Sequence, residues 1–420
     1  MTRHIAFLES NLTGAGYEAI LAAREAGHRV TFLTRDLSLY LAAGHERLDT
    51  AWLNQVVVCD TNDPGAVADA VRRLSPPADA LISVGEWHMI AAAEAARALG
   101  LPGPDPAGVR AARDKSATRA LCAAAGVPVP RFARVTSPQE VAGLDLGFPC
   151  VVKPLDDGGS NGVRLCATAA EAAGHVRTVL ADTHNERGQP KIPAALVEEY
   201  VDGPEVSVEA LVNGGEITVL AVTWKELGEH PHFVETGHHV PAALGDGLDE
   251  RCARVAADAV RAVGFDFGAV HVELRLAADG PRLIEINCRP AGDRITRLVE
   301  LATGIGIPAE LVALHLPGWT PPRPAAKGAA AIAFLPAAAG TVTEVRGEDA
   351  ARRLEGVADV SVYVAPGDAG ASPANSSANS GANSGARHGH VVATAPTGRE
   401  ALARARRAVS LLSVRTAGTH

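Results

Sequence analysis

Two short apolar segments, separated by a turn sequence, constrain the fold of this chain most. They are H-V-E-L at residues 271–274 and L-I-E-I-N-C at residues 283–288, and A-A-D-G at 277–280 lies between them. Apolar runs of this length on either side of a turn predict two adjacent antiparallel strands. The chain is therefore expected to contain a hairpin whose polar side chains have a defined direction.

Polar residues recur at every second position of the second strand and just beyond it. Because successive side chains of a strand point to opposite faces, we expect Glu285, Asn287 and Arg289 to share one face. The other face is expected to carry Ile284, Ile286 and Cys288. Glu273, on the preceding strand, adds a second carboxylate. Carboxylate and amide oxygens suit Mg²⁺ bound to a phosphate; a strand with one solvated polar face is the alternative.

The size and charge of the chain limit the classes of protein to which it can belong. Its 420 residues, of which 47% are hydrophobic, predict two to four domains with large cores. A net charge of −9 argues against a general surface for nucleic acid or anionic membranes. No basic n-region precedes the first apolar segment, and no run of about 18 apolar residues occurs. We therefore expect a cytoplasmic protein without a signal peptide or membrane span.

The cysteines are also informative about the compartment. The chain has six, at positions 59, 122, 150, 166, 252 and 288, and no two form a C-x-x-C pair. This scatter predicts reduced, structural thiols and argues against a zinc site built from cysteine.

The first hundred residues alternate apolar, strand-like runs with helical patterns. Candidate strands lie at 4–9, 28–34, 55–59 and 79–84, and candidate helices near 15–26, 64–74 and 87–99. This order predicts a Rossmann-like α/β domain over residues 1–112. The first loop, N-L-T-G-A-G at 11–16, keeps a fragment of a dinucleotide fingerprint. The broken fingerprint disfavours a Rossmann oxidoreductase.

The composition changes at about residue 316. After the linker-like P-G-W-T-P-P-R-P we expect an α+β unit over 317–420. Thr397 and Glu400 form a capping-box pattern that begins the last helix. An Asn/Ser/Gly/Ala tract at 371–386 is too polar to bury itself and predicts a loop insertion.

Two lysines and a glycine-rich loop suit a bound phosphate. Lys115 lies in the segment R-D-K-S, and Lys153 ends the apolar strand F-P-C-V-V-K. A lone lysine is usually solvated, but burying an amine at a strand end without a partner is costly. The loop D-D-G-G-S-N-G-V at 156–163 can bring backbone N–H groups close to phosphate oxygens. The loop is not a Walker A sequence, and a hairpin turn is an equal alternative.

Two further segments carry candidate ligand-binding residues. L-V-E-E-Y-V-D-G-P-E at 196–205 joins an apolar strand to a glutamate that could accept from ribose hydroxyls. H-F-V-E-T-G-H-H-V-P at 232–241 is rich in histidine, and a surface loop or a zinc site are alternatives. His230, His232 and His239 are expected to be solvated or outside direct contact with a ligand.

The order and spacing of these segments resemble the ATP-grasp superfamily of carboxylate–amine ligases, over roughly residues 100–315. The 232–241 segment resembles the branch that joins amino acids, including the bacterial L-amino-acid (dipeptide) ligases. The resemblance implies an α/β ATP-grasp fold. Its parts would be an N-terminal Rossmann-like (pre-ATP-grasp) domain, a lid subdomain at 113–194, a central catalytic subdomain at 195–316 and a C-terminal α+β subdomain.

The resemblance also implies a role for each matching residue. The phosphate-binding lysines would be Lys115 and Lys153, and the lid loop Gly158, Gly159, Ser160, Asn161 and Gly162. The adenine hinge would be Glu198, Tyr200 and Val201, the first and last mainly through backbone, with Glu205 on the ribose. The ligands of Mg²⁺, with Mn²⁺ as an alternative ion, would be Glu273, Glu285 and Asn287. Arg289 would hold the transferred phosphoryl group, and the acceptor amine and acyl phosphate would face Glu235 and His238.

The implied activity is ATP-dependent joining of an amino-acid carboxylate to an amine, expected to be that of another amino acid. It would proceed through an acyl phosphate and release ADP and phosphate. A carboxylase or formyltransferase of the same superfamily and a catalytically silent nucleotide-binding module are the alternatives. Asp293 departs from the pattern, because it adds a carboxylate near the expected substrate. The oligomeric state is open, although dimers are common among such ligases.

Overall fold

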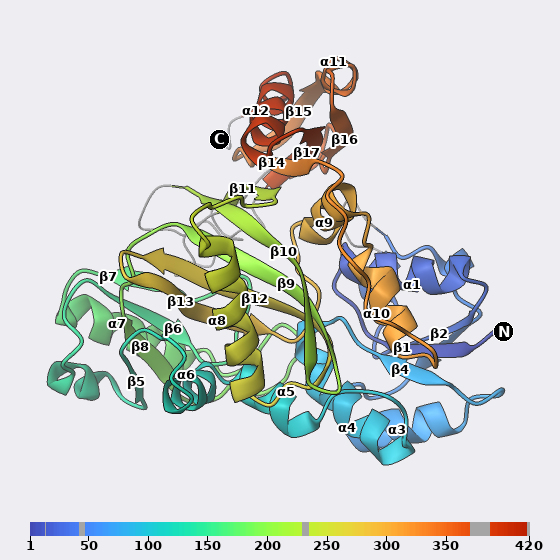
Figure 1. The fold of residues 1–420 in the computed structure, drawn as a ribbon, viewed down its shortest axis with the longest axis horizontal. Coiled ribbons are helices and arrows are strands. Elements are labelled where there is room, and N and C mark those ends of the chain that lie inside the picture. The colour runs from blue at the N-terminus through green and yellow to red at the C-terminus, as the bar shows by residue number, and fades with distance from the viewer. Residues whose placement is uncertain (13, 42–46, 229–234, 370–386, 418–420) are drawn as a thin grey trace.

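The computed structural model describes residues 1–12, 14–41, 47–228, 235–369 and 387–417 (Figure 1). His230, His232 and the Asn/Ser-rich tract at 371–386 lie outside the described residues. Within the described ranges, no helix combines the length and apolar character that crossing a membrane requires. All six cysteines are free, and all except Cys59 are buried, as predicted for structural thiols.

A parallel sheet forms the N-terminal part of the molecule (blue in Figure 1). Its strand order is β3-β2-β1-β4, with β1 (His4–Leu8), β2 (Arg29–Thr34), β3 (Gln55–Val58) and β4 (Ala80–Ile82). Ile5 and Phe7 pack into one core cluster and Ala6 and Leu8 into another, so both faces of β1 are buried. The helices of this part are α1 (Ala15–Glu25), α2 (Ser38–Leu41), α3 (Pro64–Arg72) and α4 (Met89–Leu99). The Rossmann-like order expected from the sequence is confirmed.

An antiparallel sheet follows, with strand order β5-β8-β6-β7. Its strands are β5 (Phe132–Val135), β6 (Cys150–Pro154), β7 (Arg164–Cys166) and β8 (Ala195–Glu199). Helix α7 (Ala169–Ala181) packs on it through Ala172, Val176 and Val179. Helices α5 (Pro106–Arg113) and α6 (Lys115–Ala124) precede it, and Asp105 caps α5 by accepting from the Ala107 N–H.

The largest sheet has the strand order β13-β12-β9-β10-β11-β14-β17-β16. Its strands are β9 (Glu205–Asn213), β10 (Glu216–Leu227), β11 (Glu235–Val240), β12 (Phe267–Ala277), β13 (Gly280–Asn287), β14 (Ala329–Pro336), β16 (Val357–Val362) and β17 (Arg387–Ala395). The β11–β14 pairing carries the sheet from the central strands into the C-terminal part (orange and red in Figure 1).

Helices cover the largest sheet and complete the C-terminal part. Helix α8 (Leu248–Ala262) packs on the central strands, while α9 (Ile295–Thr303) and α10 (Ile307–Leu314) join the core shared with the N-terminal sheet. The C-terminal part adds β15 (Thr341–Arg346), α11 (Glu348–Arg352), α12 (Gly398–Val409) and β18 (Ser413–Ala417). Thr397 caps α12 by accepting from the Glu400 N–H, as the capping-box pattern predicted.

The predicted hairpin at 271–288 is present, but one facing assignment was wrong. Glu273 pairs with Glu285, whereas Leu274 pairs with Leu283, so a β-bulge leaves Ile284 without an opposite residue. The bulge shifts the alternation by one position. Ile284 therefore lines the same cavity as Glu285, whereas Leu283 and Ile286 are buried in the core.

Candidate active site

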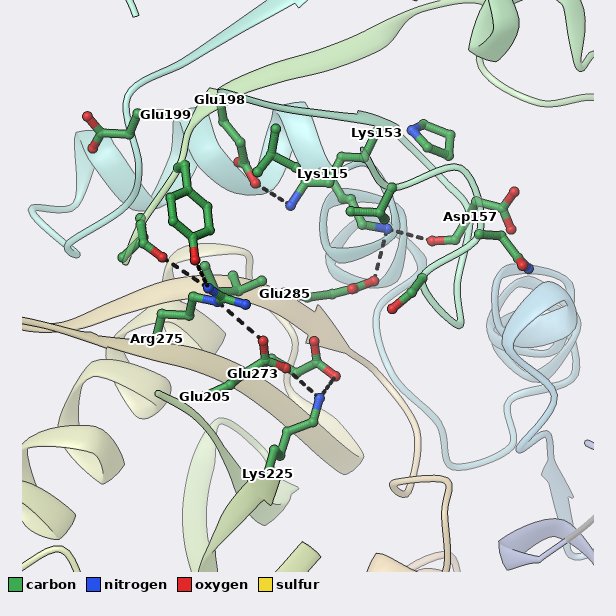
Figure 2. A pocket seen from close by; sticks show the side chains of 18 of the residues that line it. Lys115, Lys153, Asp157, Glu198, Glu199, Glu205, Lys225, Glu273, Arg275 and Glu285 are labelled. Atoms are coloured by element: carbon green, nitrogen blue, oxygen red, sulfur yellow. Dashed lines mark hydrogen bonds and ion pairs between the residues drawn. The ribbon is translucent and has the colours of Figure 1, made fainter. Parts of the chain in front are cut away.

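A cavity of about 770 Å³ lies between the β5-β8-β6-β7 sheet and strands β9 to β13. Most of the residues predicted to bind a ligand line it (Figure 2). Its charged lining residues are Lys115, Lys153, Asp157, Glu198, Glu199, Glu205, Lys225, Glu235, Glu273, Arg275 and Glu285. Concave sites with converging charged groups are the usual places where proteins bind small ligands.

The two predicted lysines enter the cavity from different elements and are both buried. Lys115, the first residue of α6, places its amine 2.9 Å from Glu285 Oε1 and donates to the Asp157 carbonyl at 2.6 Å (Figure 2). Lys153, near the end of β6, forms an ion pair with Glu198. Burial lowers the pKa of Lys153, and the Glu198 carboxylate opposes that effect. The amines therefore lie where phosphate oxygens could replace or join their carboxylate partners.

Glu198 does not occupy the position expected of a backbone hinge residue. Its strand, β8, lies between β5 and β6, and Glu198 is paired with Phe132 and Val151. Its side chain instead joins Lys153 to Arg119, whose Nε donates to Glu198 Oε2 at 3.0 Å. The expectation that Glu198 acts mainly through its backbone was wrong, because its main chain is already bonded within the sheet.

Tyr200, Val201 and Glu205 lie together at the edge of the cavity, as expected for a nucleotide hinge. Arg275, which the sequence did not single out, links all three. Its Nη1 donates to the Val201 carbonyl at 3.1 Å, and its guanidinium lies 5.5 Å from the Tyr200 ring centre. Arg275 Nε also lies 3.4 Å from Glu205 Oε2. Whether these residues contact adenine and ribose stays a prediction.

A buried lysine from β10 contacts three of the carboxylates that line the cavity. Lys225 Nζ lies 2.7 Å from Glu205 Oε1, 2.7 Å from Glu235 Oε1 and 2.8 Å from Glu273 Oε1 (Figure 2). Burial alone would lower the pKa of Lys225, but these carboxylates together raise it well above its usual value. Lys225 is therefore a fixed positive charge at the centre of an acidic group.

The acidic group has the chemistry of a divalent-cation site. Glu205, Glu235 and Glu273 each offer an oxygen within 4.8 Å of the others, and oxygen ligands suit Mg²⁺. Burial would raise the pKa of Glu273, but Lys225 and His271 hold it well below its usual value. Of the predicted ligands, Glu273 belongs to this group, Glu285 faces Lys115 from the paired position of β13, and Asn287 is buried further along that strand. Because the Lys225 ammonium already lies among these oxygens, Mg²⁺ beside a phosphate would have to share Glu273 with it; Glu273, Glu285 and Asn287 as ligands stay a prediction.

Arg289 is held by a residue of the N-terminal sheet region. Its Nη2 and Nε donate to Glu86 Oε2 at 2.9 and 3.2 Å, and Arg113 pairs with the same carboxylate. Burial would raise the pKa of Glu86, but Arg289 and Arg113 lower it to about 2. Glu86 thus stays ionised near neutral pH and fixes the direction of the Arg289 guanidinium.

The glycine-rich loop adopts the backbone that its sequence predicted. Gly159, Ser160 and Gly162 have φ values of 65°, 59° and 68°. At Gly158, a Cβ atom would lie 2.7 Å from Glu86 Oε2, so a side chain there would displace the carboxylate that holds Arg289. Ser160 and Asn161 line the cavity. Phosphate binding by this loop stays a prediction.

Glu235 and His238 lie side by side on β11, beyond the Lys225 group. Glu235 Oε2 is 3.9 Å from His238 Nε2, which lies 3.3 Å from Asp293 Oδ2. Burial raises the pKa of Glu235, and the nearby Asp293 carboxylate adds to that effect. His239 was expected to be solvated or outside direct contact with a ligand; it is buried, and its ring stacks 6.0 Å from that of Trp224. The buried His238 and the partly exposed Glu235 and Asp293 therefore form one polar cluster.

Comparison with known proteins places this site in a family. Residues 17–103, 146–297 and 333–417 match the ATP-grasp N-terminal domain, the ATP-grasp domain and the L-amino acid ligase C-terminal domain 2. An uncharacterised protein of Sinorhizobium fredii, y4rH, is 32% identical over 402 residues, which cover 94% of this chain and 80% of that protein. Carnosine synthase 1 of Gallus gallus is 30% identical over 320 residues, 72% of this chain but about a third (34%) of that protein.

A solved structure shows the same fold over the whole chain. The L-amino acid ligase of Bacillus licheniformis superposes with a TM-score of 0.81 and 23% identity, covering 99% of each chain. The fold and the cavity define an ATP-dependent ligase. The chain belongs to the ATP-grasp superfamily of carboxylate–amine ligases.

Proposed function

We propose that the protein joins the carboxylate of one amino acid to the amine of another through an acyl phosphate, with release of ADP and phosphate. The observation that carries this proposal is the single cavity in which Lys115 and Lys153, the paired Glu273 and Glu285, and Glu235 converge. The names of the matched C-terminal family, the Bacillus licheniformis enzyme and carnosine synthase support an amino-acid acceptor.

The residues at the first end of the cavity have the chemistry of nucleotide binding. Lys115 and Lys153 would neutralise phosphate oxygens, with the glycine-rich loop closing over them. Glu273, with Glu285 and Asn287 as further candidates, would hold Mg²⁺, which supplies charge neutralisation between the phosphates. Arg289, directed by Glu86, would bind the phosphoryl group as it moves to the substrate carboxylate.

Residues at the second end would serve the attacking amine. The amine nitrogen forms a bond to the acyl carbon, the bond from that carbon to the phosphate oxygen breaks, and phosphate leaves with the electron pair. The nitrogen loses a proton during this step; Glu235, which lines the cavity, would accept it, assisted by the neighbouring His238.

A phosphate-release screen of all pairs of the common amino acids, with ATP and Mg²⁺, tests the proposal. We expect phosphate release to rise above the ATP-only rate for at least one pair. Mass spectrometry should then give a product equal to the two substrates minus one water. A carboxylated or formylated product would instead assign the protein to another ATP-grasp activity, and no stimulation by any pair would refute amino-acid ligation.

A further inference from the structure

An arginine of the C-terminal part reaches the polar cluster beside the cavity. Arg387 is the first residue of β17, and its side chain is 8% exposed. Its Nη1 and Nη2 donate to Asp293 Oδ1 and Oδ2 at 2.8 and 3.0 Å, and Nη2 also donates to the Glu235 carbonyl at 3.0 Å. Such a bidentate pair fixes both the distance and the orientation of its carboxylate.

The aromatic ring of Phe334 holds the guanidinium from the other side. Arg387 Cζ lies 3.4 Å from the ring centre of Phe334, on β14, and His238 contacts the same ring edge-on at 5.7 Å. Arginine stacks on aromatic faces in this way. Phe334 therefore places Arg387 and His238 relative to each other, and both side chains reach Asp293.

Asp293 connects the C-terminal part to the catalytic candidates, because it contacts residues of both. Its backbone has a φ of 53°, a conformation that non-glycine residues adopt rarely. Asp293 Oδ2, held by Arg387, is also the oxygen that faces His238 Nε2 at 3.3 Å. Burial would raise the pKa of Asp293, but Arg387 holds it well below its usual value. An ionised Asp293 favours the His238 tautomer with its proton on Nε2.

Two buried nitrogen atoms of this cluster have no hydrogen-bond partner among the described residues. They are His238 Nδ1 and Arg387 Nε. A buried polar atom without a partner is costly, and such atoms in native proteins commonly face a ligand or water. With the proton on Nε2, the Nδ1 atom of His238 is free to accept a proton or a hydrogen bond.

We propose that Arg387 is a positioning residue for the amine-attack step and that, through Asp293, it orients His238 and Glu235. The C-terminal part thereby completes the acceptor side of the active site. This inference rests on the proposed function. Arg387 and Lys225 contact different parts of the cluster. Arg387 binds Asp293, whereas Lys225 holds Glu235 Oε1 on the side proposed to bind phosphate. A change at Arg387 should therefore affect the amine step and leave the phosphate step intact.

The test measures the two half-reactions separately, with the full-length chain. Hydroxylamine traps the acyl phosphate as a hydroxamate and, being largely unprotonated at neutral pH, it needs no base. Peptide formation measures the attack by an amino-acid amine. For Arg387→Met, we expect kcat/KM for the acceptor amino acid to fall about 10²-fold, the scale of a misplaced reacting group. Hydroxamate formation and the KM for ATP should stay within about twofold of the unaltered protein.

Further variants distinguish positioning from folding. Arg387→Lys should restore part of the acceptor kcat/KM, since an ammonium replaces the charge but not the bidentate geometry. Asp293→Asn, which keeps the shape, should reproduce the selective loss. Arg404→Met removes another arginine of the C-terminal part, which donates to the Thr394 carbonyl, and should leave both half-reactions unchanged.

Three outcomes would overturn the inference. Equal loss of hydroxamate and peptide in Arg387→Met and Asp293→Asn would mean a general structural role. Unchanged peptide formation in both variants would mean that Arg387 does not act on the amine. If the unaltered protein gives no hydroxamate with any amino acid, the proposed function itself fails, and the inference fails with it.

Discussion

The cavity buries several charged side chains, and burying them does not favour folding. Lys115, Lys153 and Lys225 are each at most 6% exposed, and each is paired with glutamate. Replacing a buried ion pair with apolar residues is often neutral or stabilising, so such pairs are weak evidence of a stabilising role. Their convergence in one cavity is better explained by a ligand that is itself highly charged, as a nucleotide with its metal ion is.

A substitution at Glu285 tests that explanation directly. Glu285→Gln keeps the side-chain shape but removes the charge that faces Lys115. We expect kcat for ADP release to fall by at least ~10²-fold, the scale of one electrostatic group in an active site. Glu216→Gln, at the exposed start of β10, is the matched control and should be unaffected. A kcat near that of the unaltered protein in Glu285→Gln would remove this residue from the site.

Arg119 should matter for stability, because it is completely buried with Glu198. Its Nη2 also donates to the Ile284 carbonyl at 2.6 Å, which ties α6 to β13. Arg119→Met leaves Glu198 with Lys153 as its ion-pair partner, and removing one member of a buried pair costs ~3–5 kcal/mol. We expect a loss at the lower end of that range, measured by urea unfolding followed by circular dichroism.

Arg131→Met is the matched control for this measurement. Arg131 pairs with Glu199 at 2.8 Å, on the same strand as Glu198, but its side chain is 59% exposed. Exposed pairs contribute ~0–1 kcal/mol, so this variant should unfold close to the unaltered protein. Similar losses of unfolding free energy in the two variants would show that burial does not determine how much these ion pairs stabilise the protein.

At the scale of helices and strands, local sequence patterns were sufficient to predict most elements. The alternation of apolar strands and helices in the first hundred residues, and the turn at 277–280, have local causes. The bulge at Ile284 was missed because it depends on how β13 fits its partner strand. Thr397 was found because capping requires a side-chain oxygen within a few residues of the helix start.

The candidate site was predictable only where its residues lie in short segments. Lys115, Lys153 and Glu273 stand out from their neighbours, and they line the cavity. Glu86 was missed because its partner Arg289 is 203 residues away, and Lys225 reads as the polar end of a strand until its glutamates are brought together. Arg387 follows a low-complexity tract, which gave no local signal of a contact with Asp293.

Helix α5 provides a prediction at the element scale, because one of its glycines permits close packing. A Cβ atom on Gly108 would lie 2.2 Å from the Gly264 carbonyl oxygen, which is backbone and cannot rotate away. Gly108→Ala should therefore destabilise the protein, since overpacking costs ~1–3 kcal/mol and exceeds the gain of ~1 kcal/mol from helix propensity.

Gly174, within α7, is the matched control for Gly108. An added Cβ there would meet no atom within 4 Å. Gly174→Ala should therefore stabilise the protein by ~0.5–1 kcal/mol. Thermal unfolding of both variants measures whether each one is stabilised or destabilised. A stabilised Gly108→Ala would show that α5 can move away from the turn at Gly264 without losing stability.

At the scale of the whole molecule, the segment between α7 and β8 connects the β5-β8-β6-β7 sheet, the expected lid, to the N-terminal sheet region. Gln189 Nε2 donates to Asn62 Oδ1 at 2.9 Å and to the Trp87 carbonyl at 3.0 Å. Asn62 Nδ2 in turn donates to the Arg187 carbonyl at 3.1 Å. Trp87 follows Glu86, which binds Arg289, so these contacts join the expected lid to the residue that orients the arginine proposed to bind the phosphoryl group.

These contacts should help to keep the lid closed while an acyl phosphate is present. Gln189→Ala removes both of these hydrogen bonds and a third, which Gln189 Oε1 accepts from Asn185 Nδ2 at 2.8 Å. Each is worth ~1 kcal/mol, so the variant should shift the lid toward an open state in which water reaches the intermediate. We expect the ratio of phosphate released to peptide formed to rise several-fold, while the KM for ATP changes little. Gln139→Ala, at an exposed glutamine of the same unit, should keep the ratio of the unaltered protein. An unchanged ratio in Gln189→Ala would mean that closure depends on ligand contacts within the cavity and not on the link between the lid and the N-terminal part.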